Sequence, residues 1–281
     1  MSKARITGAV KVGGIVGNPV AHSLSPVIHN YWIEAAGLDA SYVAFSPKDA
    51  AGFETLVAAG RAGLLSGVNV TAPFKEQAFA LADTASETAR DSGSANILVF
   101  RDGRVFADSA DGQGLLRALQ QQAPKLSLAG STVVMLGAGG AARAAAATLA
   151  GAGAQVRIVN RSRDRAEALA ADLGGSVAVA EGPAAFEGAV LIVNALTVRP
   201  EIDLAALDRS VTVMDMTYKP VITPFLQAAR DAGLVAVDGL AMLIGQAAPS
   251  FEAIFGVAPP NLDPRPFLLA HLGGSPPGGS L

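Results

Sequence analysis

The chain of 281 residues contains no cysteine. This absence excludes disulfides, thiolate nucleophiles and cysteine-ligated zinc or iron–sulfur clusters. Histidine is scarce as well, with only His22, His29 and His271 present. The spacing of His22 and His29 matches no metal-binding motif, so we predict no metal site and favour a structural or capping role for both side chains.

Clusters of one charge and long apolar runs are also missing. The net charge is −3, and the 24 acidic and 21 basic residues are interspersed, so no basic block indicates nucleic acid or a membrane surface. No segment approaches the ~20 apolar residues of a membrane helix, and the N-terminus lacks the apolar core of a secretory signal. We expect a soluble, cytoplasmic protein, a monomer or homodimer, that binds a small-molecule substrate and neither nucleic acid nor membrane.

Short apolar runs alternate with helical stretches, which predicts an α/β fold. The length favours two domains. The nearly unbroken apolar runs indicate strands buried on both faces, as in a parallel sheet covered by helices. Asp102-Gly103 separates two such runs and predicts a tight hairpin. We expect strands at 12–16, 41–45, 65–70, 97–100, 104–107, 132–136, 155–159, 176–180, 190–194, 211–215 and 234–237, helices at 25–36, 50–59, 140–150, 163–173 and 240–255, and a flexible tail at 273–281.

A glycine-rich segment, VVMLGAGGAARA, joins an apolar run to a helical stretch. Its residues Gly137, Gly139 and Ala142 have the G-x-G-x-x-A spacing of a dinucleotide-binding turn. Gly137 would permit the sharp turn, Gly139 would admit a pyrophosphate, and the amides at the helix start would bind it. An ordinary tight turn is the alternative, but the flanking strand and helix favour a dinucleotide.

The end of the following strand distinguishes NAD from NADP. NAD enzymes usually carry an acidic residue there, which binds the ribose hydroxyls. This chain has Asn160-Arg161-Ser162-Arg163 instead, with Arg165 close behind. A guanidinium can pair with a 2′-phosphate that a carboxylate would repel, so NADP(H) is the favoured cofactor. The alternative is that these arginines only cover a solvated helix.

Several polar residues outside this segment are poorly explained by packing. They are Ser23, Ser25, Asn69, Thr71, Lys75 and Asp111. A lysine at a helix start is unfavourable with the helix dipole, which favours a functional role for Lys75 over a surface role. Asp111 could instead cap the following helix, and Ser25 before Pro26 forms a natural cap and first-turn pair.

Seven segments resemble signatures of the shikimate dehydrogenase family, in the family's order and across nearly the whole chain. They are GNPVAHSLSPVIHN, GVNVTAPFK, SADGQG, GAGGAARA, NRSRDRA, DMTYKP and DGLAMLIGQAAPSF. The resemblance implies a Rossmann-type NADP-binding domain, residues 112–237, inserted into a discontinuous α/β substrate domain, residues 1–111 and 238–281. The active site would lie in the cleft between them.

The resemblance also implies a role for each matching position. Lys75 and Asp111 would be the catalytic pair. Substrate would be bound by Ser23, Ser25, Thr71, Asn96, Tyr218 and Gln246. The cofactor would be contacted by Gly137, Ala138, Gly139, Gly140, Ala141, Asn160, Arg161, Ser162, Arg165, Met216 and Gly239.

The reaction implied is the reversible reduction of 3-dehydroshikimate to shikimate by NADPH, a step of chorismate and aromatic amino-acid biosynthesis. Reduction of a ketone needs a hydride at carbon and a proton at the developing alkoxide. A cationic lysine such as Lys75 can stabilise that alkoxide and donate the proton. A carboxylate such as Asp111 can hold the ammonium and accept a hydrogen bond from a substrate hydroxyl.

Three departures from the family's usual pattern leave alternatives open. Ser109-Ala110 stands where the family usually has Asn-Thr, Ile97 stands where it has threonine, and NALTVRP replaces a common Asn-Ala-Thr-Ser-Gly form. The first two changes suggest a paralogue that acts on quinate or an amino analogue of shikimate. A catalytically idle NADP(H)-binding sensor is a third hypothesis, but the presence of both Lys75 and Asp111 argues against it.

Overall fold

A computed structural model describes residues 6–196, 198 and 200–273. The tail expected at 273–281 lies outside the described residues from 274 onward, as do Thr197 and Arg199 of the NALTVRP segment. The chain forms two compact units, one up to Ala110 and again from Gln246, the other from Asp111 to Gly245. Each unit contains one six-stranded sheet, so the expected α/β fold is confirmed.

The sheet of the first unit is mixed. Its strands are β1 (Lys11–Val16), β2 (Ala40–Phe45), β3 (Gly67–Val70), β4 (Thr84–Ala85), β5 (Ile97–Arg101) and β6 (Arg104–Asp108), in the order β2-β1-β3-β5-β6-β4. β1 runs parallel to β2 and β3, whereas β5 is antiparallel to β3 and β6. The expected hairpin is confirmed, because Asp102 and Gly103 take the positive φ angles (51° and 74°) that its tight turn requires.

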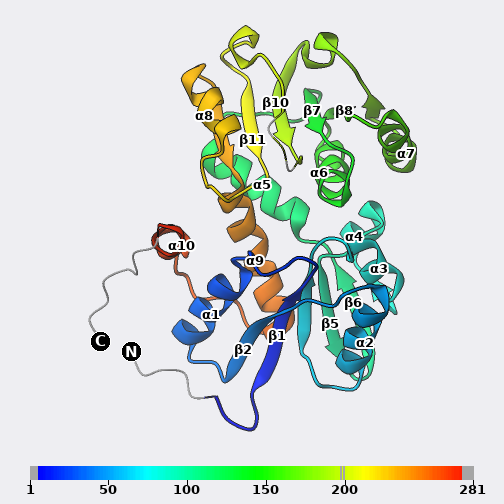
Figure 1. Ribbon diagram of the computed structural model, residues 1–281, viewed down its shortest axis with the longest axis vertical. Helices are drawn as coiled ribbons and strands as arrows, with labels where there is room; N and C mark the ends of the chain where they lie inside the picture. Colours follow the sequence, from blue (N-terminus) through cyan, green and yellow to red (C-terminus); the bar gives the residue numbers. More distant parts are fainter. Residues whose placement is uncertain (1–5, 197, 199, 274–281) are drawn as a thin grey trace. The chain divides into compact units, whose positions relative to one another are not determined.

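Helices of the first unit pack on this mixed sheet or, in the case of α10 (Arg265–Leu272), on α1 (Ser25–Ala36). The others are α2 (Ala50–Arg61), α3 (Lys75–Ala80), α4 (Glu87–Ser92) and the C-terminal part of α9 (Gly239–Phe255). In Figure 1, α1 lies beside β2, while α2 lies near β5 and β6. Phe53 of α2 stacks on Phe74 inside the apolar core, with ring centroids 4.9 Å apart.

The sheet of the second unit is entirely parallel. Its strands are β7 (Thr132–Leu136), β8 (Gln155–Val159), β9 (Val177–Val179), β10 (Ala189–Asn194), β11 (Thr212–Asp215) and β12 (Val235–Asp238), in the order β12-β11-β10-β7-β8-β9. This is the doubly wound order of dinucleotide-binding domains. The order reverses between β7 and β10, the position at which such sheets bind ligands.

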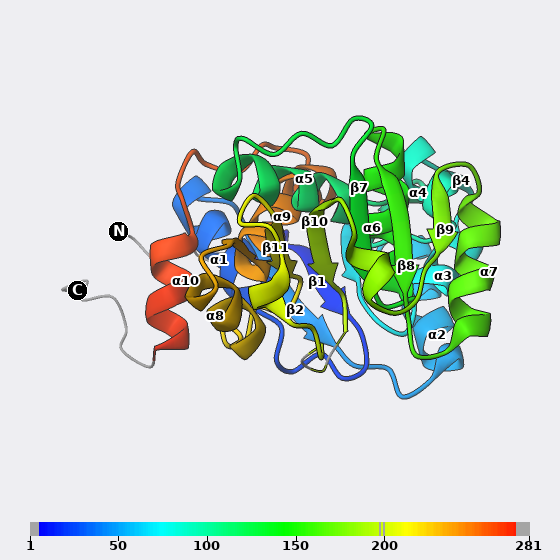
Figure 2. The same cartoon turned by 90° about the horizontal axis from the view of Figure 1, so that it is seen from above.

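Two apolar clusters cover the two faces of the parallel sheet. The elements that contribute are α5 (Asp111–Gln122), α6 (Gly140–Gly151), α7 (Arg163–Leu173), α8 (Pro224–Asp231) and the 3-10 helices η1 (Pro183–Phe186) and η2 (Leu204–Ala206). Val133 and Met135 pack with α5, α6 and α7, while the alternate residues Val134 and Leu136 pack with α8 and η2. Figure 2 shows α7 beside β8 and β9.

None of the helices in the described part of the chain is long and apolar enough to cross a membrane.

Candidate active site and cofactor site

The glycine turn lies at the switch point of the parallel sheet. Gly137 follows β7 with a φ of 112°, and its amide donates a hydrogen bond to the carbonyl of Val159 at 2.9 Å. A Cβ at this position would lie 3.3 Å from Cδ2 of Leu196, in a conformation that side chains rarely adopt. The turn therefore requires glycine, as the sequence predicted.

The start of α6 meets the requirements of an anion site. Gly139 is the N-cap residue, and no side chain caps the helix. A Cβ at Gly139 or at Gly140 would meet no atom within 4 Å, so the space beside these two residues is open. A helix of twelve residues whose first amides are not capped by a side chain fits the pyrophosphate of a dinucleotide.

The arginines after β8 differ in what they contact. Arg163 pairs with Glu167 at 2.7 Å and with Glu181 at 3.2 Å, so its charge is engaged within the second unit. Arg161 and Arg165 are exposed and line a pocket of about 1170 Å³ together with Asn160. Asn160 donates a hydrogen bond to the carbonyl of Ser162 at 2.8 Å, which holds the turn before α7.

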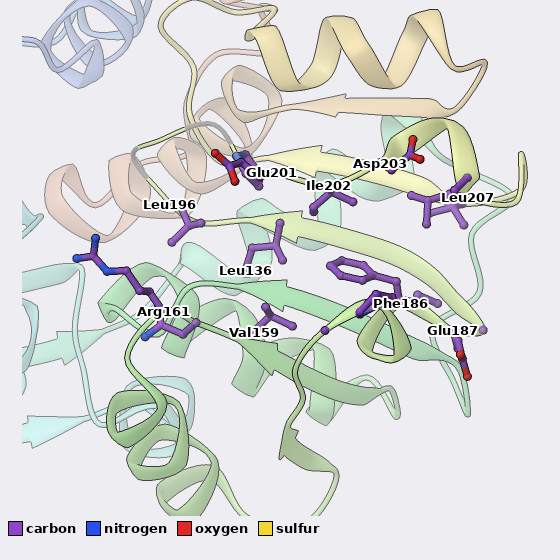
Figure 3. Close-up of a pocket in the computed structure, with 18 of the residues that line it drawn as sticks. Leu136, Val159, Arg161, Phe186, Glu187, Leu196, Glu201, Ile202, Asp203 and Leu207 are labelled. Atoms are coloured by element: carbon purple, nitrogen blue, oxygen red, sulfur yellow. The ribbon is translucent and has the colours of Figure 1, made fainter.

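This pocket combines an apolar floor with Arg161 at one end, while carboxylates such as Glu201 and Asp203 lie elsewhere in its lining (Figure 3). Figure 3 shows the side chains of Leu136, Val159, Phe186 and Ile202 over the strands, with Arg161 at one end. The adenine ring of NADP(H) would match the apolar floor, and its 2′-phosphate would match the guanidinium. Residues around the pocket thus fit the adenosine 2′-phosphate part of NADP(H).

A buried hydrogen-bond network orders the loops that follow β10 and β11. Asp215 accepts hydrogen bonds from Nδ2 of Asn194 at 3.2 Å, from the hydroxyl of Thr223 at 2.7 Å and from the amide of Thr217 at 3.0 Å. Because Thr217 lies between Met216 and Tyr218, this carboxylate holds the segment to which the sequence assigned cofactor and substrate contacts. Both neighbours are partly buried in the second unit.

Gly239 is required by a close backbone approach. A Cβ there would lie 2.5 Å from the carbonyl oxygen of Met216 and 2.7 Å from that of Thr217. Gly239 and Met216, both predicted to line the nicotinamide end, are therefore neighbours in the structure.

Thr71 and Lys75, which the sequence predicted to act on the substrate, follow β3. The amide of Thr71 donates to the carbonyl of Val16 at 2.9 Å, and Lys75 is the first residue of α3. The Lys75 side chain is partly buried, and its carbonyl accepts a hydrogen bond from the amide of Ala95 at 2.9 Å. Lys75 belongs to the first unit, whereas Asp111 opens the second unit as the first residue of α5.

Two side chains predicted to bind substrate, Asn96 and Gln246, contact each other directly. Nδ2 of Asn96 donates to Oε1 of Gln246 at 3.1 Å, and Oδ1 of Asn96 accepts the amide of Ala110 at 2.9 Å. Asn96 is only 3% exposed, so these bonds set the direction of its amide group. The structure thus brings together two residues that are 150 positions apart in the sequence.

The interpretation of Ser25 as a helix cap is wrong. Leu24 is the N-cap residue of α1, no side chain caps this helix, and Ser25 already lies in its first turn with Pro26. The amide of Ser25 donates to the hydroxyl of Ser23 at 3.2 Å, so the two serines are adjacent. The hydroxyl of Ser25 contacts the phenol of Tyr42 instead of the helix backbone.

Comparison with known proteins identifies the family. Residues 15–98 match the family model described as the shikimate dehydrogenase substrate binding domain, and residues 118–202 match that of shikimate / quinate 5-dehydrogenase. The shikimate dehydrogenase (NADP(+)) of Caulobacter vibrioides is 52% identical, over 95% of this chain and 98% of that protein. The chain belongs to the shikimate dehydrogenase family.

Solved structures agree with this family assignment. The shikimate dehydrogenase of Aquifex aeolicus is 32% identical and superposes with a TM-score of 0.84, covering 91% of this chain and 96% of that chain. The Thermus thermophilus shikimate 5-dehydrogenase, solved with NADP(H) and shikimate, is 34% identical with a TM-score of 0.80, again covering 91% and 96%.

Two of the departures from the usual shikimate dehydrogenase pattern contact the same apolar cluster. Ile97, Val99 and Ala110 are buried together, with Ala253 packed against them. Two apolar residues therefore stand together where the family usually has two threonines, so neither leaves an unpaired buried hydroxyl. These departures change the packing behind the site, and they leave Lys75 and Asp111 in place.

The sequence analysis missed three residues next to the predicted substrate contacts. Tyr42 and Ser250 received no role, and Asn69 was noted without one, yet all three are buried and hydrogen-bonded to each other or to predicted site residues. No local signal marks Tyr42, because a tyrosine in a strand usually packs in the core.

His29 has the structural role that was predicted for it, because its ring stacks on that of Tyr42 with centroids 4.1 Å apart.

Proposed function

We propose that this chain catalyses the reversible reduction of 3-dehydroshikimate to shikimate, with NADPH as the reductant. The observation that carries the proposal is the membership of the shikimate dehydrogenase family over nearly the whole chain, including a relative named as NADP(+)-dependent. The glycine turn at the switch point and the exposed Arg161 and Arg165 support the same cofactor.

We assign the cofactor to the second unit. Open amides at the start of α6 would hold the pyrophosphate, and Arg161 and Arg165 would pair with the 2′-phosphate. Met216 and Gly239 would line the nicotinamide. When bound, the reduced nicotinamide supplies the hydride that the reaction needs. The predicted domain at 112–237 would be this cofactor domain.

We assign most of the substrate contacts to the first unit. The hydroxyls of Ser23 and Ser25 can donate to a carboxylate, while the amides of Asn96 and Gln246 can bind ring hydroxyls. Thr71 and Tyr218 add further hydroxyl groups. A cyclic acid with several hydroxyls matches this set, because neutral donors and acceptors outnumber charged groups among these residues.

Lys75 and Asp111 would carry the acid–base chemistry. The Lys75 ammonium would stabilise the developing alkoxide and give it a proton, a contribution of roughly 10²–10⁴-fold in rate. Asp111 would accept a hydrogen bond from a substrate hydroxyl and keep the lysine charged. In the reverse direction, Lys75 would take the proton from the hydroxyl of shikimate.

The experiment that tests the proposal is steady-state oxidation of shikimate and of quinate, each with NADP⁺ and with NAD⁺. We expect a strong preference in kcat/KM for shikimate with NADP⁺. Activity with quinate alone would show that the altered residues around Asp111 have changed the pocket. NADPH binding without activity toward either acid would indicate a sensor and overturn the proposal.

Cellular location and assembly remain predictions from the sequence, namely a cytoplasmic enzyme that is a monomer or homodimer and binds no nucleic acid. Size-exclusion chromatography with light scattering distinguishes the monomer from the dimer.

A further inference from the structure

A chain of buried hydrogen bonds connects the predicted substrate residues of the first unit through Tyr42. Its phenol donates to Oδ1 of Asn69 at 2.7 Å and contacts the hydroxyl of Ser25. Nδ2 of Asn69 donates to the hydroxyl of Ser250 at 2.8 Å, and that hydroxyl donates to the carbonyl of Gln246 at 2.9 Å. The chain thus runs from Tyr42 on β2 to Gln246 on α9, with the hydroxyl of Ser25 beside its first member.

The direction of each bond in this chain is determined by one backbone group. Nδ2 of Asn69 also donates to the carbonyl of Asn96 at 3.1 Å, and a carbonyl can only accept. Oδ1 of Asn69 must therefore face Tyr42, and Tyr42 must donate its single proton to it.

Backbone hydrogen bonds, ring stacking and burial fix the position of Tyr42, and so they fix the position of its hydroxyl. The side chain of Asn30 binds both backbone groups of Tyr42, with its Nδ2 donating to the carbonyl at 2.8 Å and its Oδ1 accepting the amide at 3.1 Å. His29 stacks on the phenol ring at an interplanar angle of 3°. Tyr42 is 1% exposed, and burial raises the pKa of its phenol well above the usual range, which keeps it a neutral donor.

We propose that Tyr42 is a positioning residue for the substrate, because its hydroxyl fixes the Asn69 side chain, which binds the backbone of Asn96 directly and that of Gln246 through Ser250. The inference rests on the substrate contacts assigned under the proposed function. The side chains of Asn96 and Gln246 would then project toward the substrate from backbone that is already held in place. Preorganisation of this kind strengthens ground-state and transition-state binding equally, so it acts on KM more than on kcat.

Tyr42→Phe tests the proposal, because it removes the hydroxyl and keeps the ring that stacks on His29. We expect KM for shikimate to rise roughly tenfold, the effect of one buried hydrogen bond, with kcat and KM for NADP⁺ nearly unchanged. Tyr31→Phe is the matched control, since Tyr31 stacks on Phe267 with centroids 4.7 Å apart and lies outside the chain of bonds. A KM that is unchanged or lower in Tyr42→Phe, with the protein folded, overturns the proposal.

Two further measurements keep the test independent of folding and of the identity of the substrate. Ser250→Ala removes an acceptor of Asn69 at the far end of the chain and should raise KM for shikimate in the same direction. Hydrogen exchange of the Asn69 side-chain amide, followed by NMR without substrate, should accelerate in Tyr42→Phe and stay unchanged in Tyr31→Phe. Unchanged exchange in both variants overturns the positioning role even if the protein does not act on shikimate.

Discussion

A guanidinium nitrogen of Arg117 donates a hydrogen bond to the carbonyl of Gly245 at 2.8 Å. This carbonyl lies four residues before Pro249, which is inside α9 and has no amide hydrogen to donate. An arginine of α5 therefore replaces the helical bond that the proline removes. The bond lies next to the point where the chain passes from the second unit back to the first, between Gly245 and Gln246.

Loss of this replacement bond should destabilise the second unit. We expect Arg117→Met to lower the free energy of unfolding by about 1 kcal/mol, because the Gly245 carbonyl loses its donor. The effect should shrink in a Pro249→Ala background, where the amide of residue 249 can form the helical bond. Urea denaturation of the four variants of this cycle measures the coupling, with the exposed Arg209→Met as the control. Additive effects would show that the two residues are independent.

Substitution of Lys75 should affect the chemical step. We expect Lys75→Ala to lower kcat by roughly 10²–10⁴-fold, because the alkoxide loses its proton donor and its stabilising charge. NADPH binding, measured by fluorescence titration, should hardly change, since we assign the cofactor to the second unit. Lys48→Ala, at an exposed lysine of the first unit, is the control. A kcat equal to that of the unaltered protein would remove Lys75 from the mechanism.

Substitutions of the arginines after β8 should differ in their effect on cofactor binding. Arg161→Ala should raise KM for NADP⁺ by about tenfold and barely change KM for NAD⁺, because only NADP⁺ carries the 2′-phosphate. The matched control is Arg163→Ala, which removes the neighbouring arginine that already pairs with Glu167 and Glu181. Steady-state kinetics with both cofactors measures these KM values. Equal increases in KM for NADP⁺ and for NAD⁺ would contradict the assignment.

His29 should make the stability of the protein depend on pH. Burial lowers the pKa of His29 from 6.5 to about 3, and its Nδ1 is the one buried side-chain nitrogen or oxygen in the described residues without a hydrogen-bond partner. Below pH 6.5 the unfolded chain binds a proton at His29 that the folded chain does not bind. The contribution of His29 to the free energy of unfolding is therefore fully present above that pH. It is lost progressively as the pH falls toward 3.

The size of this effect can be measured as the difference between the free energies of unfolding at pH 8 and at pH 5. At pH 5 the contribution of His29 should be a loss of about 2 kcal/mol relative to pH 8. His29→Phe keeps an aromatic ring against Tyr42 and removes the titrating group, so its unfolding free energy should fall less between these two pH values. Identical losses in both proteins, measured by urea denaturation, would show that His29 is not the group responsible.

Features that depend on short stretches of sequence could be predicted. The turn at Gly137 needs one positive φ angle and the hairpin at Asp102-Gly103 needs two adjacent ones, so composition and spacing were sufficient. Short helices such as α3, α4 and α10 were not predicted, because six to eight residues show too little apolar periodicity. The cap assigned to Ser25 failed because α1 begins one residue earlier than the Ser-Pro pair suggested.

The sequence alone determined the local chemistry, namely a glycine turn before a helix, arginines in place of an acidic residue, and a lysine and an aspartate in family motifs. Only the tertiary structure decided which distant side chains meet. Tyr42 reaches Asn69 because β2, β1 and β3 pair in parallel register, and Asn69 reaches Ser250 because α9 packs on the same unit. Ile97 and Ala110 become neighbours in the same way. Such contacts depend on strand order and register, which non-local packing sets, so no local pattern in the sequence could reveal them.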